Sequence, residues 1–265
     1  MDKKNNELIK IFLEPVRKCS DYKPAFGQSK SEGMSLSDFT DLYGRDSFYT
    51  WIGLNDPLLY AAHKAAGGLT SVYRQVGIGS ERLLQTVIMS SLGLKKNQIT
   101  WEYLYDKPDG KKGVHILDAK IAIEDLCENS KNLFRPWLKS ALKKVSLNNK
   151  SMQITGAAFE IRQGYKSADS KRQNADLRFG IRAYQASLIP VFAVLSSQVS
   201  DPVVKRYQRD GMLVLTGINS SDTTTSTFAF FRDVIGFDLA AFFELNSKII
   251  RQEIKLILEK LLTAK

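Results

Sequence analysis

The stretch FEIRQGYKSADSKRQNAD, residues 159–176, is the most informative part of this chain. It follows an apolar run from Ile154 to Phe159 that predicts a β-strand, and it leads into a helical pattern over residues 171–187. Acids, bases and amides crowd the segment between strand and helix. A carboxylate at the end of a strand can hold a hard metal ion, and a polar run behind it can reach phosphates and base edges. This pairing favours a metal-dependent nuclease.

The composition sets broad limits on the class of protein. The 265 residues are 43% hydrophobic and 25% charged, as in an ordinary globular protein with a full core. A net charge of +10 favours a polyanionic partner, through steering and counterion release. Two cysteines and two histidines are too few for a zinc cluster or a disulfide framework.

The expected location is cytoplasmic. No run approaches the ~18 apolar residues that a membrane helix needs. The N-terminus, Met1 to Asn6, lacks the apolar segment of a signal peptide. Together with the charge, these features predict a cytoplasmic protein that binds double-stranded DNA.

The pattern along the chain predicts an α/β fold, a mixed sheet flanked by helices. The expected elements are a helix opened by Ser80, strands 99–105 and 114–123 joined as a hairpin, a helix 134–145, a strand ending at Glu160, a helix 171–187, a strand 191–196, a helix 202–209, a strand 212–216 and a terminal helix from Phe237. The first three strands suit antiparallel pairing, and the later ones suit parallel pairing because helices connect them. Residues 77–265 are thus expected to form one catalytic and DNA-binding domain.

The sequence predicts that residues 1–76 form a mainly helical region packed on that domain. An amphipathic helix is expected over residues 5–20 and a loop over residues 21–47. A further helix begins at Pro57, with Asp56 as its N-cap, and Gly67-Gly68 is expected to end it.

The order of elements resembles the core of the PD-(D/E)XK nucleases, above all the type II restriction endonucleases. In that family a first helix often carries a glutamate, a second strand an aspartate, and a third strand an acid followed two residues later by a lysine. Glu81 resembles the helix glutamate, Asp118 the aspartate and Glu160 the third-strand acid. The resemblance implies Mg²⁺ held by Asp118 and Glu160, with Asp176 or Glu81 reached through water.

Each of these acids also has a structural interpretation. Glu81 can complement the dipole of its helix, Asp118 can face water at a strand end, and Glu160 can form a surface pair with Arg162. Burial of a carboxylate within an apolar strand is costly unless the group is paired or bound to metal, which favours the metal site for Asp118.

Position 162 departs from the family, because it is arginine where lysine is usual. Alternation along a strand puts Glu160 and Arg162 on one face. A guanidinium stays protonated and is bulkier than an ammonium, so it can act as an electrostatic clamp but not as a proton carrier. Lys120 and Lys166 could supply an amine instead, and we favour Arg162 or Lys166 beside the scissile phosphate as the catalytic cation.

A second register of the motif is possible. Pro108-Asp109, eight residues, and then Asp118-Ala119-Lys120 spell the family pattern literally. However, Pro108-Asp109-Gly110 is a strong β-turn sequence, and the tip of a turn is a poor place for a buried metal. The order of the later elements also favours Glu160 as the third-strand acid.

A narrower resemblance covers residues 160–178. Restriction enzymes that read CCGG or interrupted CC-GG sites carry an Arg-Ser-Asp-Arg-like comb after the third strand, and a displaced acid on the next helix. Asp176, fourteen residues after Arg162, resembles the displaced acid. In this chain the corresponding polar run, residues 166–174, contains one inserted residue. The side chains expected to contact DNA are Lys166, Ser167, Asp169, Lys171, Arg172, Gln173 and Asn174, with Arg74 from a glycine-rich basic segment.

The sequence therefore predicts a type II site-specific deoxyribonuclease that hydrolyses both strands at a short, GC-rich palindrome as a twofold homodimer with Mg²⁺. The apolar stripe of the terminal helix is a candidate dimer element, or else it packs within the chain. Three alternatives remain. One is a repair or recombination nuclease on this fold that reads DNA structure, and the second is a DNA-binding protein with a degenerate site. The third is a different intracellular α/β enzyme whose positive charge is incidental.

Overall fold

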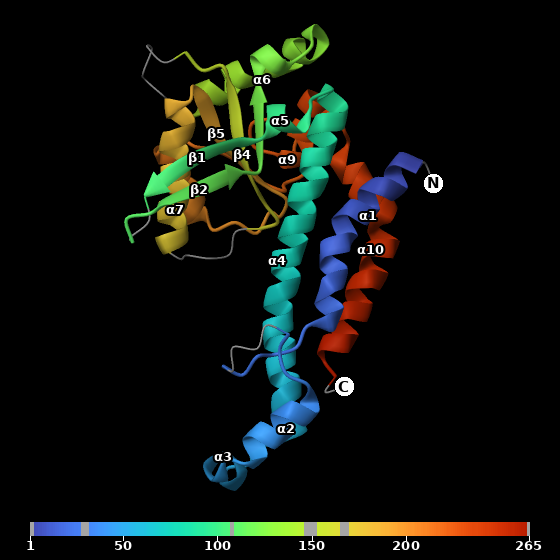
Figure 1. The fold of residues 1–265 in the computed structure, drawn as a ribbon. Coiled ribbons are helices and arrows are strands. Elements are labelled where there is room, and N and C mark those ends of the chain that lie inside the picture. Colours follow the sequence, from blue (N-terminus) through green and yellow to red (C-terminus); the bar gives the residue numbers. More distant parts are fainter. Residues whose placement is uncertain (1–2, 28–31, 107–108, 146–152, 165–169, 264–265) are drawn as a thin grey trace. The chain divides into compact units, whose positions relative to one another are not determined.

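The computed structural model describes residues 3–27, 32–106, 109–145, 153–164 and 170–263 (Figure 1). The chain divides into two compact units, one made of Met1–Gly79 with Glu244–Lys265 and one of Ser80–Phe243. The sequence placed this division at residue 76 and grouped the terminal helix with the sheet. In the structure that helix belongs, from Glu244 on, with the N-terminal helices.

The unit Ser80–Phe243 contains the strands, and its α/β class matches the prediction. Its elements after the end of α4 are α5 (Lys96–Ile99), β1 (Trp101–Asp106), β2 (Lys112–Leu117), β3 (Ala119–Ala122), η2 (Ile123–Asp125), α6 (Glu128–Lys144), β4 (Gly156–Arg162), α7 (Ser170–Gln185), β5 (Leu188–Val194), α8 (Asp201–Arg209), β6 (Leu213–Leu215), α9 (Thr227–Phe230) and the π-helical turn η3 (Phe231–Ile235). Four strands form a sheet of order β3-β4-β5-β6, in which β3 is antiparallel to β4 and the other pairs are parallel.

The predicted strand 114–123 is in fact two strands. β2 pairs with β1 as a separate antiparallel ribbon, and Trp101 lies opposite Leu117. After Asp118 the chain changes partner, and β3 pairs with β4 so that Ala119 lies opposite Phe159. Asp118 is therefore a junction between two sheets, a position that a single apolar run does not reveal.

Both faces of the four-stranded sheet are covered. On one face, α7 and α8 close a core that includes Ala158, Phe179, Phe192, Tyr207 and Val214. On the other face, Phe159 stacks on Trp137 of α6 with ring centroids 6.3 Å apart, and Trp137 lies 4.5 Å from Phe230 of α9. Because β4 is covered on both sides, the charged pair Glu160 and Arg162 enters a protein interior rather than an open surface.

The unit Met1–Gly79 with Glu244–Lys265 is helical. It contains α1 (Lys3–Arg17), η1 (Lys18–Asp21), α2 (Leu36–Gly44), α3 (Ser47–Trp51) and the larger parts of α4 (Pro57–Leu92) and α10 (Leu239–Leu261). The stretch predicted as loop over residues 21–47 contains α2, which Ser35 and Asp38 open with a capping box. The apolar stripe of α10 packs within this unit, where Ile257 and Leu261 join a buried cluster with Val16, Cys19 and Val72.

The prediction that Gly67-Gly68 ends a helix is wrong, and so is the prediction that Ser80 begins one. α4 runs unbroken from Pro57 to Leu92, and Ser80 is buried in it. The glycines instead permit close packing. A Cβ on Gly67 would meet the Tyr22 hydroxyl at 2.0 Å, and one on Gly79 would meet the Phe12 carbonyl oxygen at 2.3 Å.

We expect Gly79→Ala to lower the free energy of unfolding by about 1–3 kcal/mol, because the added methyl group meets backbone that cannot move aside. Gly77→Ala is the matched control, since its Cβ would meet nothing within 4 Å. That change should raise stability by about 0.5–1 kcal/mol through helix propensity. Urea unfolding of both variants measures the difference, and equal effects at the two positions would contradict the packing role.

No helix in the described part of the chain is long and apolar enough to span a bilayer. Both cysteines are free, Cys19 buried and Cys127 exposed.

Candidate active site

Three carboxylates converge on one guanidinium at the end of β4. Nη2 of Arg162 lies 2.7 Å from Oε2 of Glu160 and 3.4 Å from Oδ1 of Asp176, and its Nη1 lies 4.0 Å from Oδ2 of Asp118. The acids come from β4, from α7 and from the junction between β2 and β3. The predicted set Asp118, Glu160, Arg162 and Asp176 is therefore brought together, although the residues span 58 positions of the sequence.

The position of Asp118 is set by the junction between β2, which pairs with β1, and β3, which pairs with β4. Its Oδ2 accepts a hydrogen bond from the backbone N–H of Ile161 at 2.6 Å, so the carboxylate sits against β4 next to Glu160. Gln85 of α4 holds the other side of the junction, because its Nε2 donates to the Asp118 carbonyl oxygen at 2.6 Å. The same Nε2 donates to Oε1 of Glu81 at 3.1 Å. Glu81 thus approaches the cluster from α4, as the resemblance implied.

Asp176 is held from α8. The Tyr207 hydroxyl donates to its Oδ2 at 2.7 Å, and both groups are buried. One turn earlier on α7, Gln173 is also buried, and its Oε1 accepts a hydrogen bond from Arg206 at 2.6 Å. The assignment of Gln173 as a DNA-reading side chain is therefore corrected, because this amide faces α8 and joins α7 to it.

Negative charge is in excess in this cluster, and the pKa values reflect it. Burial, and then the charges of Glu160 and Glu81, raise the pKa of the Asp118 carboxyl to about 8. Burial and the charge of Glu160 also raise the pKa of Glu81. Among the described residues, the Arg162 guanidinium is shared by more carboxylates than its single charge balances, which favours binding of a further cation.

Arg162 is incompletely satisfied. Burial alone lowers the pKa of its guanidinium, but Glu160, Asp176 and Asp118 outweigh that effect and raise it, so the group stays charged. Its Nε is buried and has no hydrogen-bond partner among the described residues. An unpaired buried donor costs about 1–3 kcal/mol. The contacts present therefore do not use the full bonding capacity of this side chain.

His115 of β2 also reaches the acid cluster. Its Nε2 lies 3.1 Å from Oε1 of Glu160, and its side chain is 41% exposed. The ring lies beside Tyr103, with centroids 5.1 Å apart. The strand ends at Leu117, so residues 113, 115 and 117 share the inward face.

A cleft of about 230 Å³ opens onto these groups. The aromatic side chains of Tyr103 and Tyr105 line it, together with Arg178 and Phe179 of α7. Glu160, Arg162 and Asp176 lie on its wall, so a ligand in the cleft contacts the charged cluster. The ring of Tyr105 lies over Gly113, where a Cβ would be 2.5 Å from it, so glycine at that position shapes the cleft.

The raised pKa of Asp118 predicts how stability depends on pH in the absence of divalent cations. The folded state holds a proton that the unfolded state releases, from the ordinary pKa of 3.8 up to about 8. The contribution of this group to the unfolding free energy should therefore be highest below about pH 3.8, should fall as the pH rises from there to about 8, and should level off above pH 8. Urea titrations from pH 5 to 9 in EDTA test the sign, and a rise in stability over that range would contradict the buried charge.

Of the remaining predicted residues, those whose side chains the structure describes, Asn174, Arg74 and Lys120, are not in the cluster. Lys166, Ser167 and Asp169 lie outside the described residues, and α7 carries Lys171 and Arg172 at its start. Asn174 is exposed, and Arg74 is exposed on α4 in the helical unit. Lys120 lies on β3 opposite Ala158.

The second register is not supported by the position of its first acid. Asp109 lies in the turn between β1 and β2, is exposed, and accepts a hydrogen bond from the N–H of Lys111 at 3.1 Å. It therefore stabilises the turn of the ribbon.

The donor set suits a hard divalent cation. Carboxylate oxygens are the ligands that Mg²⁺ prefers, and the raised pKa of Asp118 shows the electrostatic cost that such an ion would relieve. Within the described ranges, no three His, Cys, Asp or Glu side chains stand as a ready-made metal cluster. The Arg162 guanidinium lies where the carboxylates converge, so it must yield some of these contacts if an ion binds.

Comparison with known proteins gives no match, either to a protein-family model, to a curated protein or to a solved structure.

Proposed function

We propose that this chain is a Mg²⁺-dependent endonuclease that cuts double-stranded DNA at a short, GC-rich palindrome. The observation that carries the proposal is the meeting of Asp118 and Glu160 around one cation, at the joined ends of β2, β3 and β4. The resemblance of the element order to a restriction-endonuclease core supports the proposal. The charge of +10 favours a DNA partner.

In this proposal Asp118 and Glu160 hold the metal, and Asp176 and Glu81 contribute through water. The bound ion would supply Lewis-acid stabilisation of the phosphate and an activated water. Arg162 supplies a fixed positive charge, and its unpaired Nε provides a donor that a phosphate oxygen could use once the side chain moves. His115 lies on the open side of Glu160 and orients that carboxylate.

The DNA contacts are proposed for the start of α7 and the segment before it, with Lys166, Ser167, Asp169, Lys171, Arg172 and Asn174 as candidates. Arg178, which lines the cleft one turn further along α7, is an additional candidate that the sequence did not single out. A twofold homodimer would let each copy cut one strand of a palindrome.

A cleavage assay on bacteriophage DNA with Mg²⁺ tests the function. Discrete fragments support a site-specific enzyme, whereas smears or cuts at branches support a repair nuclease. Asp118→Ala should abolish cutting and leave binding in Ca²⁺ largely intact. Full cutting by that variant would contradict the metal site.

One observation favours a second candidate, a DNA-binding protein without nuclease activity. Arg162 already neutralises part of the acid cluster at the position where the family usually has lysine. In that case gel shifts would appear on specific duplexes, with no cutting by the unmodified chain in Mg²⁺ or Mn²⁺.

A further inference from the structure

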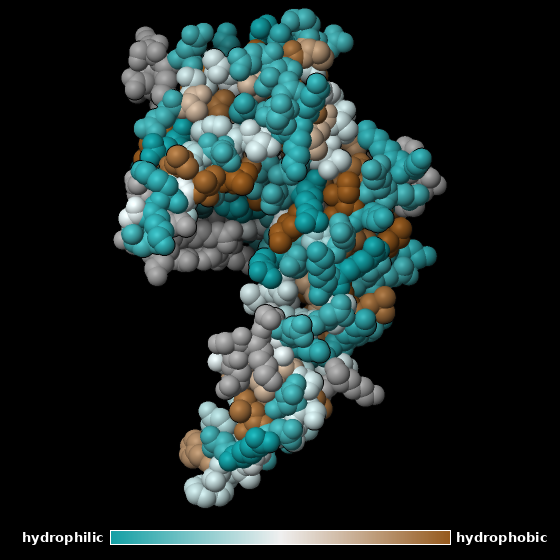
Figure 2. All heavy atoms as spheres, in the orientation of Figure 1, coloured by the Kyte–Doolittle hydropathy of each residue, from teal (hydrophilic) through white to brown (hydrophobic). Residues whose placement is uncertain are grey.

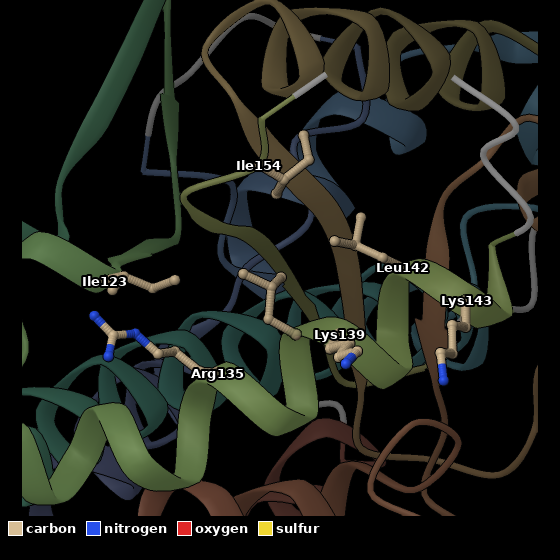
Figure 3. A pocket seen from close by; sticks show the side chains of 7 residues that line it. Ile123, Arg135, Lys139, Leu142, Lys143 and Ile154 are labelled. Atoms are coloured by element: carbon tan, nitrogen blue, oxygen red, sulfur yellow. The ribbon is translucent and has the colours of Figure 1, made fainter. Parts of the chain in front are cut away.

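A second hollow, of about 510 Å³, lies along α6 and is unrelated to the acid cluster (Figure 3). Ile123, Leu142 and Ile154 give it apolar walls, and Arg135, Lys139 and Lys143 line it with positive charge. We call it the basic groove. The three cations are spaced four residues apart, so they follow one stripe of the helix.

The cations of the basic groove are available to a partner. Lys139 and Lys143 are exposed and form no ion pair within the part of the chain that the structure describes. A volume of this size lies in the range of ligand pockets. Its mixed lining fits a ligand with apolar side chains and carboxylates better than it fits a bare phosphate backbone.

The basic groove is not part of the proposed DNA site. α6 covers the face of the sheet that carries Phe159, whereas Glu160 and Arg162 point to the face covered by α7. Ile154 precedes β4 and Arg162 ends it, so the two sites are also separated by the length of a strand, about 20 Å. A duplex held at the acid cluster therefore leaves the groove free.

A segment of the helical unit has the complementary character. Residues 36–58 contain four aspartates, one arginine and no lysine or glutamate, in a chain whose net charge is +10. Apolar side chains stand out from the same segment, with Trp51 81% exposed, Leu58 77% and Phe48 59%. Figure 2 shows hydrophobic surface over α2 and α3, where this segment lies. We call it the acidic apolar segment.

Contacts between its own residues stabilise the conformation of the acidic apolar segment. Phe39 and Tyr43 have ring centroids 4.4 Å apart, and Tyr43 stacks on Tyr49 at 4.8 Å. Asp46 caps α3 by accepting a hydrogen bond from the N–H of Tyr49 at 3.0 Å. These contacts order the backbone of the segment before it binds, which lowers the entropy cost of docking.

We propose that the acidic apolar segment of one copy docks in the basic groove of a second copy. Trp51 is the apolar anchor, and the aspartates of the segment face Lys139 and Lys143 of the neighbour. Because the two surfaces differ, the contact is head-to-tail, and it can close as a reciprocal pair, close as a larger ring or continue as an open chain. It is independent of DNA, of metal and of the proposed cleavage.

Sedimentation velocity of the full chain, without DNA and in EDTA, tests the contact over a range of concentrations. Self-association is expected to weaken as salt rises from 0.1 to 0.5 M. Trp51→Ala, and separately Lys139→Glu with Lys143→Glu, should each weaken it at least tenfold. Lys95→Glu with Lys96→Glu makes the same change of charge on exposed lysines outside the groove and should leave it unchanged.

Mixing the Trp51→Ala chain with the groove variant, Lys139→Glu with Lys143→Glu, tests whether the segment of one copy binds the groove of another. The Trp51→Ala chain keeps its groove and the groove variant keeps its segment, so the mixture should form one-to-one pairs and nothing larger. A mixture that stays monomeric would overturn the proposal. It would also be overturned if the groove variant self-associated as strongly as the unmodified chain, because that result would indicate contact between two acidic apolar segments. A concentration-independent monomer of the unmodified chain would also overturn it. Circular dichroism of each variant checks that these exposed changes leave the fold intact.

Discussion

Asp118→Asn is expected to make the apo protein more stable and to abolish cleavage. At pH 8 without divalent cations, the change removes a buried charge that Glu160 and Glu81 repel, and the amide oxygen can still accept the hydrogen bond from Ile161. We expect the free energy of unfolding to rise by about 1–3 kcal/mol. Cleavage in Mg²⁺ should fall by about 10³-fold or more, since one of the two proposed metal ligands is lost.

Asp109→Asn is the matched control for this prediction. Asp109 is exposed in the turn of the ribbon, so its variant should differ from the unmodified chain by about 0.5 kcal/mol or less and should cut normally. Loss of cutting in Asp109→Asn would instead favour the second register of the motif. An Asp118→Asn chain that is destabilised and still cuts would contradict both the buried charge and the metal site.

Arg162→Met is expected to be the most destabilising single change in the cluster. It removes the guanidinium that lies within 4.0 Å of Glu160, Asp176 and Asp118. Leaving buried carboxylates without their partner costs about 3–5 kcal/mol. Thermal and urea unfolding in EDTA measure the loss. Arg182→Met is the control on α7, because its guanidinium is exposed and bonds Gln185 only one turn away.

Divalent cations should partly restore the Arg162→Met chain. If the carboxylates can gather a metal ion, Mg²⁺ or Ca²⁺ takes over the charge that the guanidinium supplied, and binding to the folded state stabilises it. The melting temperature of this variant should therefore rise more with 10-fold steps of Mg²⁺ than that of the unmodified chain. A variant indifferent to both ions would contradict the metal site, whether or not the unmodified chain cuts DNA.

The sequence pattern alone predicted those features that depend on a single strand or helix. The apolar run before Glu160 predicted β4, and alternation placed Glu160 and Arg162 on one face, where they form an ion pair. The helix that carries Asp176 was also predicted at its observed place within a few residues. These features depend on periodicity and neighbouring residues alone.

Sequence patterns gave wrong predictions where packing against segments distant in sequence overrides the helix propensity of the local residues. Gly67 and Gly68 are helix breakers by propensity, but α4 continues through them because Tyr22 and Leu261 pack closely where their Cβ atoms would be. α2 was missed because a short helix among serines and aspartates has little propensity. Tilted ring contacts of Phe39 with Tyr43 and Tyr60 stabilise it.

The sequence by itself determined the α/β class, the strand that bears Glu160 and the identity of the acids, because these follow from short-range patterns and residue chemistry. Only the tertiary structure decided that Asp118 is a junction between two sheets, that His115 and Tyr207 reach the acids, and that Gln173 turns toward α8. Those outcomes depend on which segments distant in sequence pack together. A charge is tolerated in the interior only where such packing brings it a partner.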